Sequence, residues 1–267
     1  YKLYRSVFYS RGEIYITLEE FKSQLNKIKT LVIEQHQSLY LDELESLIIK
    51  VNLFGFHFAS LDIRQNSKIH DAVFKDIYDF YIKSNESVFP KNYYDLSEQD
   101  KFEVLSNVKG ALNPDDFENE ITRLTIESIQ AIKVIQGNNG ELGANRYIIT
   151  NNENALNVME TFALIRLSDW ENPTVDVVPL FESVDDLLNA HNVMEQLYTN
   201  PVYANHLVNR EMKQTIMLGF SDGTKDGGYL MANWSIYKAK EELTAISRKY
   251  GIKVIFFDGR GGPPSRG

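Results

Sequence analysis

From residue 146 onward the chain alternates regularly between short apolar segments and helical patterns, and this alternation constrains its fold more than any other feature. The apolar segments are RYIIT (146–150), TVDVVPLF (174–181), TIMLGF (215–220) and IKVIFF (252–257), and FHFASLDI (56–63) precedes them. Strands that alternate with helices form parallel sheets, and strands covered by helices are apolar on both faces, as these are. We therefore predict an α/β fold with about five strands. An open doubly wound sheet and part of a (β/α)8 barrel of the TIM type both fit this pattern.

The helical patterns carry start and stop signals. Residues 1–54 are predicted to be a helical lead-in, and the rest of the chain is also rich in helix. Asn113 followed by Pro114 predicts the start of a long helix that runs to about residue 136. A further helix is expected from about Tyr229 to Tyr250, closed by Gly251. Three pairs have the spacing of helix N-caps: Thr17 with Glu20, Ser97 with Asp100, and Ser183 with Asp186.

Charge and composition exclude several classes of protein. The 267 residues carry a formal net charge of −9, which argues against a nucleic-acid or anionic-membrane partner because both need a basic face. The chain has no cysteine, so a disulfide framework and a cysteine-based metal site are excluded. No apolar run approaches the roughly 18 residues that span a bilayer. We expect a cytoplasmic protein without membrane or nucleic-acid partners.

Polar side chains follow four of the five predicted strands. In an α/β barrel the carboxyl ends of the strands form the rim that carries the active site. The alternative is that charged residues follow any strand, because loops are polar. The residues concerned are Arg64, Glu182, Asp222, Lys225, Asp258, Arg260 and Arg266.

The types of these side chains suit one another. Glu182 and Asp222 are carboxylates on neighbouring strand ends, and two carboxylates with open positions suit Mg²⁺ or Mn²⁺. Arg64, Arg260 and Arg266 could bind phosphate or carboxylate oxygens through two parallel hydrogen bonds. Together they indicate a phosphorylated, carboxylated substrate. The structural alternatives are that Glu182 belongs to the adjacent helix cap, that Arg64 pairs with a nearby acid, and that the RGG-like terminus is a flexible tail.

Four blocks resemble the phosphoenolpyruvate carboxylase family and occur in the order of that family. They are GFHFASLDIRQNS (55–67), VPLFESVDDLLNA (178–190), IMLGFSDGTKDGGYLMANW (216–234) and FFDGRGGPPSRG (256–267). The resemblance implies a (β/α)8 barrel wrapped in extra helices, a homotetramer, and dependence on Mg²⁺ or Mn²⁺. The implied reaction converts phosphoenolpyruvate and bicarbonate to oxaloacetate and phosphate. Residues 55–267 would then be an incomplete barrel segment within one larger domain.

The resemblance also implies a role for individual residues. Glu182 and Asp222 match the metal ligands of the family, and Arg64 and Arg260 match its phosphate-binding arginines. Lys225 matches its active-site lysine. Arg266 matches the arginine of a mobile glycine-rich loop, which is tied to catalysis and to feedback inhibition.

The chain departs from the family pattern near its end. The family has a histidine where Asp258 stands, and this exchange is expected to place an anion beside an anionic substrate. Pro263 and Pro264 are also unusual in the glycine-rich loop, and Phe220 and Gly223 replace a usual tyrosine and serine. The essential histidine of the family, in a Thr-Ala-His-Pro block, is expected upstream of this segment, and about three barrel strands are missing by the eight-strand rule.

We therefore expect the isolated segment to be inactive, and to aggregate through its open sheet edges. Two other readings remain open at this point. The chain could belong to another metal-dependent barrel enzyme that acts on pyruvate or phosphoenolpyruvate. It could also be a non-catalytic module that uses the RGG-type terminus to bind RNA.

Overall fold

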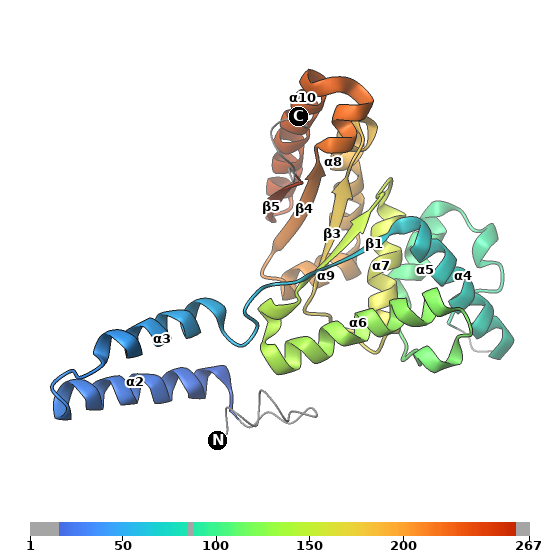
Figure 1. Ribbon diagram of the computed structural model, residues 1–267. Coiled ribbons are helices and arrows are strands. Elements are labelled where there is room, and N and C mark those ends of the chain that lie inside the picture. The colour runs from blue at the N-terminus through green and yellow to red at the C-terminus, as the bar shows by residue number, and fades with distance from the viewer. Residues whose placement is uncertain (1–15, 85–87, 260–267) are drawn as a thin grey trace. The chain divides into compact units, whose positions relative to one another are not determined.

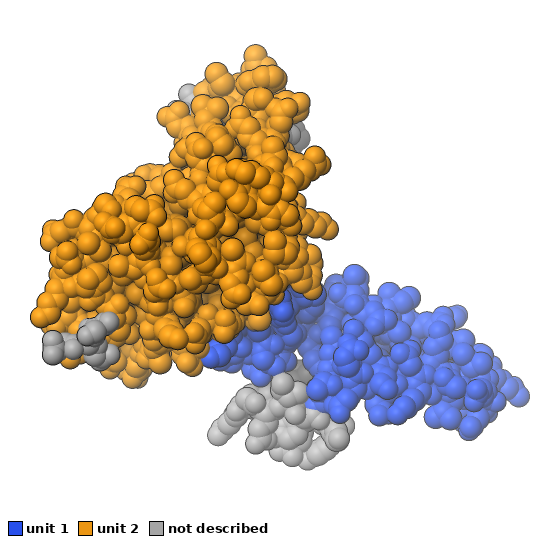
Figure 2. Space-filling view, turned by 180° about the vertical axis from the view of Figure 1, so that it is seen from behind, with its two compact units in different colours: residues 1–61, 131–145 blue, residues 62–130, 146–267 orange. Residues whose placement is uncertain are grey.

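The computed structural model describes residues 16–84 and 88–259, apart from the side chains of residues 221–223 and 226. The chain divides into two compact units, which Figure 2 shows in blue and orange. Unit 1 consists of residues 1–61 and 131–145, and unit 2 of residues 62–130 and 146–267. Among the described helices, none combines the length and the apolar character needed to cross a lipid bilayer.

Unit 1 contains a pair of helices, α2 (Leu18–Gln35) and α3 (Leu41–Phe54). The predicted capping box at Thr17 is confirmed, because its side chain accepts a hydrogen bond from the backbone N–H of Glu20 and the Glu20 carboxylate accepts one from Thr17. Lys29 of α2 forms an ion pair with Glu45 of α3 at 2.7 Å. Unit 1 also contains the second part of α6 (Glu120–Asn139) and the short 3-10 helix η3 (Glu141–Gly143).

Unit 2 contains a five-stranded parallel sheet in the order β1-β2-β3-β4-β5, which confirms the predicted α/β class and strand number. Figure 1 shows these strands with the helices that connect them. The strands are β1 (Asp62–Asn66), β2 (Arg146–Thr150), β3 (Asp176–Phe181), β4 (Lys213–Gly219) and β5 (Lys253–Gly259). The helices are α4 (Ser67–Ser84), α5 (Glu98–Asn107), the first part of α6, α7 (Ala155–Leu167), α8 (Val184–Thr199), α9 (Pro201–Asn209) and α10 (Ser221–Lys249), with 3-10 turns η1 (Tyr93–Asp95) and η2 (Pro114–Asp116).

The two faces of the sheet have different partners. On the face that we call the helix face, Tyr147 contacts His70 of α4 at 3.0 Å, and Gln214 contacts Tyr203 of α9 at 2.9 Å. On the other face, which we call the inner face, Ile148, Val178, Leu180 and Met217 form a buried cluster with Phe257 packed against it. Side chains alternate between faces along each strand, so this cluster has one member or two from each of β2 to β5.

The sheet is strongly curved towards its inner face. The guanidinium carbon of Arg146 on β2 lies 5.8 Å from the ring centroid of Phe257 on β5. These strands are separated by β3 and β4, which in a flat sheet corresponds to roughly 14 Å at the usual strand spacing. Side chains stand roughly perpendicular to a sheet, so a contact across this span requires curvature.

Several predicted boundaries are wrong. Residues 56–61 do not form a strand: Phe58 has a positive φ of 59°, and β1 begins only at Asp62. Pro114 opens the short 3-10 helix η2, whereas α6 begins at Glu120, where the side chain of Asn119 accepts a hydrogen bond from the N–H of Ile121. Helix α9 was not predicted, and α10 begins eight residues before the predicted Tyr229.

Candidate active site

The carboxyl ends of β3 and β4 lie in close contact. Side chains alternate between the two faces along β3, so Glu182 points to the same inner face as Val178 and Leu180. Its side chain is half-buried. Gly219, the last residue of β4, lies against it: a Cβ atom built on Gly219 would be 3.0 Å from the Cα of Glu182. Any larger residue at position 219 would therefore displace the backbone that carries Glu182.

A second glycine continues this side-chain-free surface on β5. Gly259 pairs in register with Gly219, and a Cβ atom on Gly259 would lie 3.0 Å from the carbonyl oxygen of Leu218. Two residues before these glycines, Met217 pairs with Phe257 in the buried cluster of the inner face. The ends of β4 and β5 thus combine an apolar floor with two positions that project no side chain next to Glu182.

The first turns of α10 follow β4 directly. Asp222 belongs to the first turn, and Lys225, whose side chain is exposed, follows three residues later. The N-cap residue, Phe220, makes no side-chain cap hydrogen bond. A helix start of this kind presents backbone N–H groups that suit an anion. The side chain of Asp222 lies outside the described part of the chain.

Two glycines shape this end of α10. Gly228 has φ 76° and ψ 169°, which interrupts the helix and separates the segment 221–227 from the long part of α10. A Cβ atom on Gly227 would lie 3.1 Å from the side chain of Val184, the first residue of α8. The segment that contains Asp222 and Lys225 is therefore packed against the helix that starts directly after Glu182 and Ser183.

We predicted that Arg64 follows a strand, but it lies in the middle of β1. It pairs in register with Ile148, which pairs with Val178. Glu182 comes four residues after Val178, which corresponds to about 13 Å along the strand. Arg64 is exposed and lies on the same face as Glu182, but the structure does not bring the two backbones together.

We expected Asp258 to place an anion beside the substrate, and the structure shows that its carboxylate lies next to a lysine. It lies within β5 on the helix face, between the inner-face residues Phe257 and Gly259. Its two carboxylate oxygens lie 2.7 and 2.9 Å from the ammonium nitrogen of Lys240 on α10. The same ammonium group lies 5.6 Å from the ring centroid of Phe256. The negative charge of Asp258 is thus balanced by Lys240, a contact that the sequence did not predict.

The remaining predicted residues, Arg260 and Arg266, lie outside the described part of the chain, as do Pro263 and Pro264. Within the described residues, no group of three or more histidine, cysteine or carboxylate side chains could hold a metal ion. The two-carboxylate set of Glu182 and Asp222 is smaller than such a group. Sites of that size occur with Mg²⁺, which keeps several waters and binds substrate oxygens.

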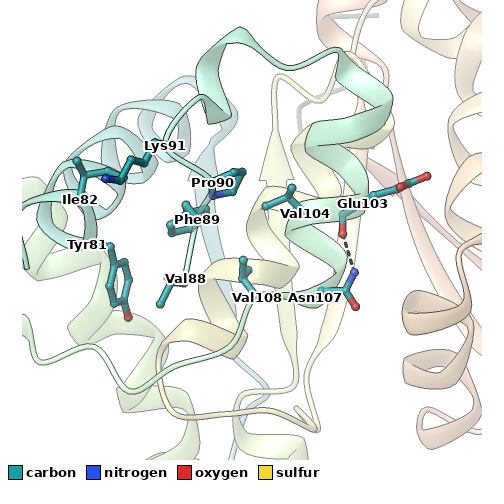
Figure 3. A pocket seen from close by; sticks show the side chains of 10 residues that line it. All are labelled: Tyr81, Ile82, Val88, Phe89, Pro90, Lys91, Glu103, Val104, Asn107 and Val108. Atoms are coloured by element: carbon teal, nitrogen blue, oxygen red, sulfur yellow. Dashed lines mark hydrogen bonds between the residues drawn. The ribbon is translucent and has the colours of Figure 1, made fainter. Parts of the chain in front are cut away.

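A large surface pocket lies away from these strand ends. It has a volume of 730 Å³ and is lined by residues from the end of α4, the segment before η1, and α5. Figure 3 shows Tyr81, Phe89 and Pro90 on one side and Val104, Asn107 and Val108 on the other. It contains none of the predicted site residues, so its size does not make it part of the candidate active site.

Unit 2 also contains a buried carboxylate that sequence reasoning missed. Glu160 of α7 is 8% exposed, and one of its oxygens lacks a hydrogen-bond partner. Burial and the nearby carboxylate of Asp71 raise the pKa of Glu160 to about 8. Glutamate inside an otherwise apolar helix pattern, VMETFALI, is the signal that could have identified it.

Comparison with known proteins identifies the family. A model of the phosphoenolpyruvate carboxylase family matches residues 3–267. The chain is 34% identical over 269 residues to the phosphoenolpyruvate carboxylase of Nitrosomonas eutropha, covering 96% of this chain and 28% of that protein. It is 32% identical over 271 residues to the phosphoenolpyruvate carboxylase of Nitrosomonas europaea, covering 97% of this chain and 28% of that protein.

The chain belongs to the phosphoenolpyruvate carboxylase family. It spans 28% of the length of the two Nitrosomonas relatives, so it corresponds to a segment of those phosphoenolpyruvate carboxylases. The similarity covers nearly the whole chain, including the two blocks that carry Glu182 and the start of α10.

Proposed function

We propose that this chain is a segment of an enzyme that carboxylates phosphoenolpyruvate with bicarbonate to give oxaloacetate and phosphate. The observation that carries the proposal is the contact between the ends of β3 and β4, where Gly219 lies against Glu182 and the first turn of α10 contains Asp222. Family membership supports the reaction, and the sheet supports the location of the site.

We infer that Glu182 and Asp222 hold a divalent cation, Mg²⁺ or Mn²⁺. The donor set supports this, because carboxylate oxygens with open positions for water and substrate suit these hard ions. The glycines at 219 and 259 support it too, because they leave room beside Glu182. The cation, when bound, supplies positive charge that stabilises the enolate oxygen of the substrate.

In the proposed reaction, an oxygen of bicarbonate attacks the phosphorus of phosphoenolpyruvate. The products of this step are carboxyphosphate and the enolate of pyruvate. Carboxyphosphate then releases carbon dioxide and phosphate, and the enolate carbon attacks carbon dioxide to form oxaloacetate. Arg64 and Arg260 would neutralise charge on the transferring phosphoryl group. Because Arg64 starts from the middle of β1, its side chain must extend along the inner face to reach this site.

Two further residues of this chain belong to the proposed site. Lys225 adds a positive charge one helical turn after Asp222, where an anionic substrate benefits from it. Arg266 belongs to the glycine-rich loop after β5, and closure of that loop would exclude water from carboxyphosphate and the enolate.

We further infer that the sheet is part of a (β/α)8 barrel. The sequential strand order, with no reversal among the five strands, supports this reading over a doubly wound sheet. The contacts of α4, α9 and α10 with one face, and the curvature indicated by Arg146 and Phe257, also support it. A homotetramer, as the family resemblance implies, and a cytoplasmic location are part of the same proposal.

The experiment uses the full-length protein. Oxaloacetate is followed through NADH consumption by added malate dehydrogenase, with Mg²⁺ or Mn²⁺, in the presence and absence of bicarbonate. The proposal predicts turnover that requires bicarbonate and is abolished in Asp222→Ala. Turnover of phosphoenolpyruvate without bicarbonate would instead indicate another metal-dependent enzyme acting on this substrate.

A further inference from the structure

Unit 2 contains a small polar pocket at the opposite ends of the strands from Glu182. It has a volume of 140 Å³ and lies between the end of α7, the segment before β3, and α9, which precedes β4. We call it the Arg166–His206 pocket. Its lining also includes the amide side chains of Asn172, Asn205 and Asn209, and it shares no residue with the candidate active site.

The two residues that name the pocket are both buried. Arg166 is 8% exposed and His206 is 3% exposed. Arg166 donates one hydrogen bond, from Nη1 to the carbonyl oxygen of Ser106 at 2.6 Å, and its guanidinium lies 5.7 Å from the ring centroid of Phe162. A guanidinium has five N–H donors, so one such bond leaves capacity towards the pocket.

His206 has an unsatisfied ring nitrogen. Its Nδ1 is buried and has no hydrogen-bond partner. Burial and the positive charge of Arg210 lower the pKa of His206 to about 3, so the ring is neutral near pH 7. A neutral imidazole still carries one N–H that can donate to an oxygen. A buried polar atom without a partner costs free energy, and a ligand oxygen in the pocket would remove that cost.

The charges around the pocket favour an anion. Its one carboxylate, Glu171, is exposed; it forms an ion pair with Lys109 at 2.9 Å and also interacts with the charge of Arg166. The carbonyl groups of Arg166 and Leu167 at the end of α7 accept hydrogen bonds from the N–H groups of Gly110 and Leu112. These acceptors are therefore satisfied, whereas Nδ1 of His206 has no hydrogen-bond partner.

We propose that the Arg166–His206 pocket binds a small oxyanion, of the phosphate or carboxylate type, at a site separate from the candidate active site. Its volume exceeds the roughly 30 Å³ that one water occupies in the liquid and suits a group of a few heavy atoms. Arg166 provides the charge, His206 an additional donor, and the surrounding asparagine amides further donors. The inference goes beyond the proposed reaction and does not depend on it.

The test measures binding to the full-length protein by thermal shift, in separate titrations with inorganic phosphate and with acetate. Asn205→Asp adds a negative charge at the exposed rim of the pocket, and Asn192→Asp makes the same change at an exposed position of α8 outside it. His206→Phe removes the ring nitrogens and keeps a ring to pack against Phe162 and Tyr203.

We expect Asn205→Asp to weaken the apparent affinity for the anion by about fivefold relative to Asn192→Asp. The loss in His206→Phe should be about tenfold or more. An effect with phosphate alone or acetate alone supports the site and identifies the type of ligand. Equal titration curves for Asn205→Asp and Asn192→Asp with both anions would overturn the proposal, even if His206→Phe fails to fold. Because no turnover is measured, the result does not depend on whether the chain belongs to an active carboxylase.

Discussion

Gly219 lies so close to Glu182 that a Cβ atom at position 219 would be 3.0 Å from the Cα of Glu182 and 3.2 Å from the carbonyl oxygen of Phe181. Both neighbours are backbone atoms, which cannot turn away as a flexible side chain can. We predict that Gly219→Ala lowers the stability of the full-length protein by about 1 to 3 kcal/mol and weakens activation by Mn²⁺.

The measurements are the melting temperature and the Mn²⁺ concentration for half-maximal activity. Gly137→Ala is the matched control, because no heavy atom lies within 4 Å of a Cβ at that helical position. It should stabilise the protein by about 0.5 to 1 kcal/mol. Unchanged Mn²⁺ activation in Gly219→Ala would show that Glu182 tolerates the displacement.

The raised pKa of Glu160 predicts that the stability of the protein depends on pH. Its pKa is raised to about 8 in the folded protein, from 4.5, because of burial and the carboxylate of Asp71. Between these values the folded state holds a proton that the unfolded state releases, so the stability contributed by this group is present below pH 4.5 and is lost as the pH rises towards 8.

We predict that Glu160→Gln raises the melting temperature at pH 8.5 by several degrees and changes it little at pH 4.5, where wild-type Glu160 is protonated. The measurement compares melting temperatures of wild type and variant across this range. Glu127→Gln, at an exposed position of α6, serves as the control and should show no such pH-dependent difference. A difference between wild type and Glu160→Gln that is the same at every pH would contradict the prediction.

Because Asp258 forms an ion pair with Lys240, we predict a small effect of replacing either residue. The two side chains are 48% and 34% exposed, and pairs of that kind contribute about 0 to 1 kcal/mol. We predict that Asp258→Asn and Lys240→Met each lower stability by no more than this and leave turnover of the full-length enzyme within about twofold. In the double variant the losses should not add, because each single change already removes the pair. A loss of turnover by more than about tenfold in Asp258→Asn alone would mean that the carboxylate acts on the substrate.

Local signals in the sequence predicted the parts of the fold that depend on neighbouring residues. Ser183 and Asp186 form the capping box that their spacing indicates. Glu182 directly precedes that cap, so its backbone position at the end of β3 followed from the same signal. The alternation of strands and helices predicted the parallel sheet, because only helix-covered strands are apolar on both faces.

The parts that could not be predicted depend on contacts between distant residues. FHFAS is rich in aromatic residues but forms a turn, whereas the polar segment DIRQN forms β1 because it pairs with β2, with Asp62 and Arg146 in an ion pair at 2.8 Å. The strand propensity of a segment is a weak predictor, because pairing with neighbouring strands determines whether the segment forms a strand. The position of Arg64 depends on the register between β1 and β2, and the partner of Asp258 depends on the packing of α10. Neither can be predicted from a local sequence pattern.

The most direct test of the proposed site is the binding of Mn²⁺ to the full-length protein, followed by electron paramagnetic resonance of the free ion. We predict that Glu182→Gln and Asp222→Asn each weaken binding by at least about tenfold, because each removes a charged ligand. Asp185→Asn, an exposed acid three residues after Glu182, should bind Mn²⁺ as wild type does. Equal Mn²⁺ affinity in wild type, Glu182→Gln and Asp222→Asn would contradict the assignment of the metal site to the ends of β3 and β4.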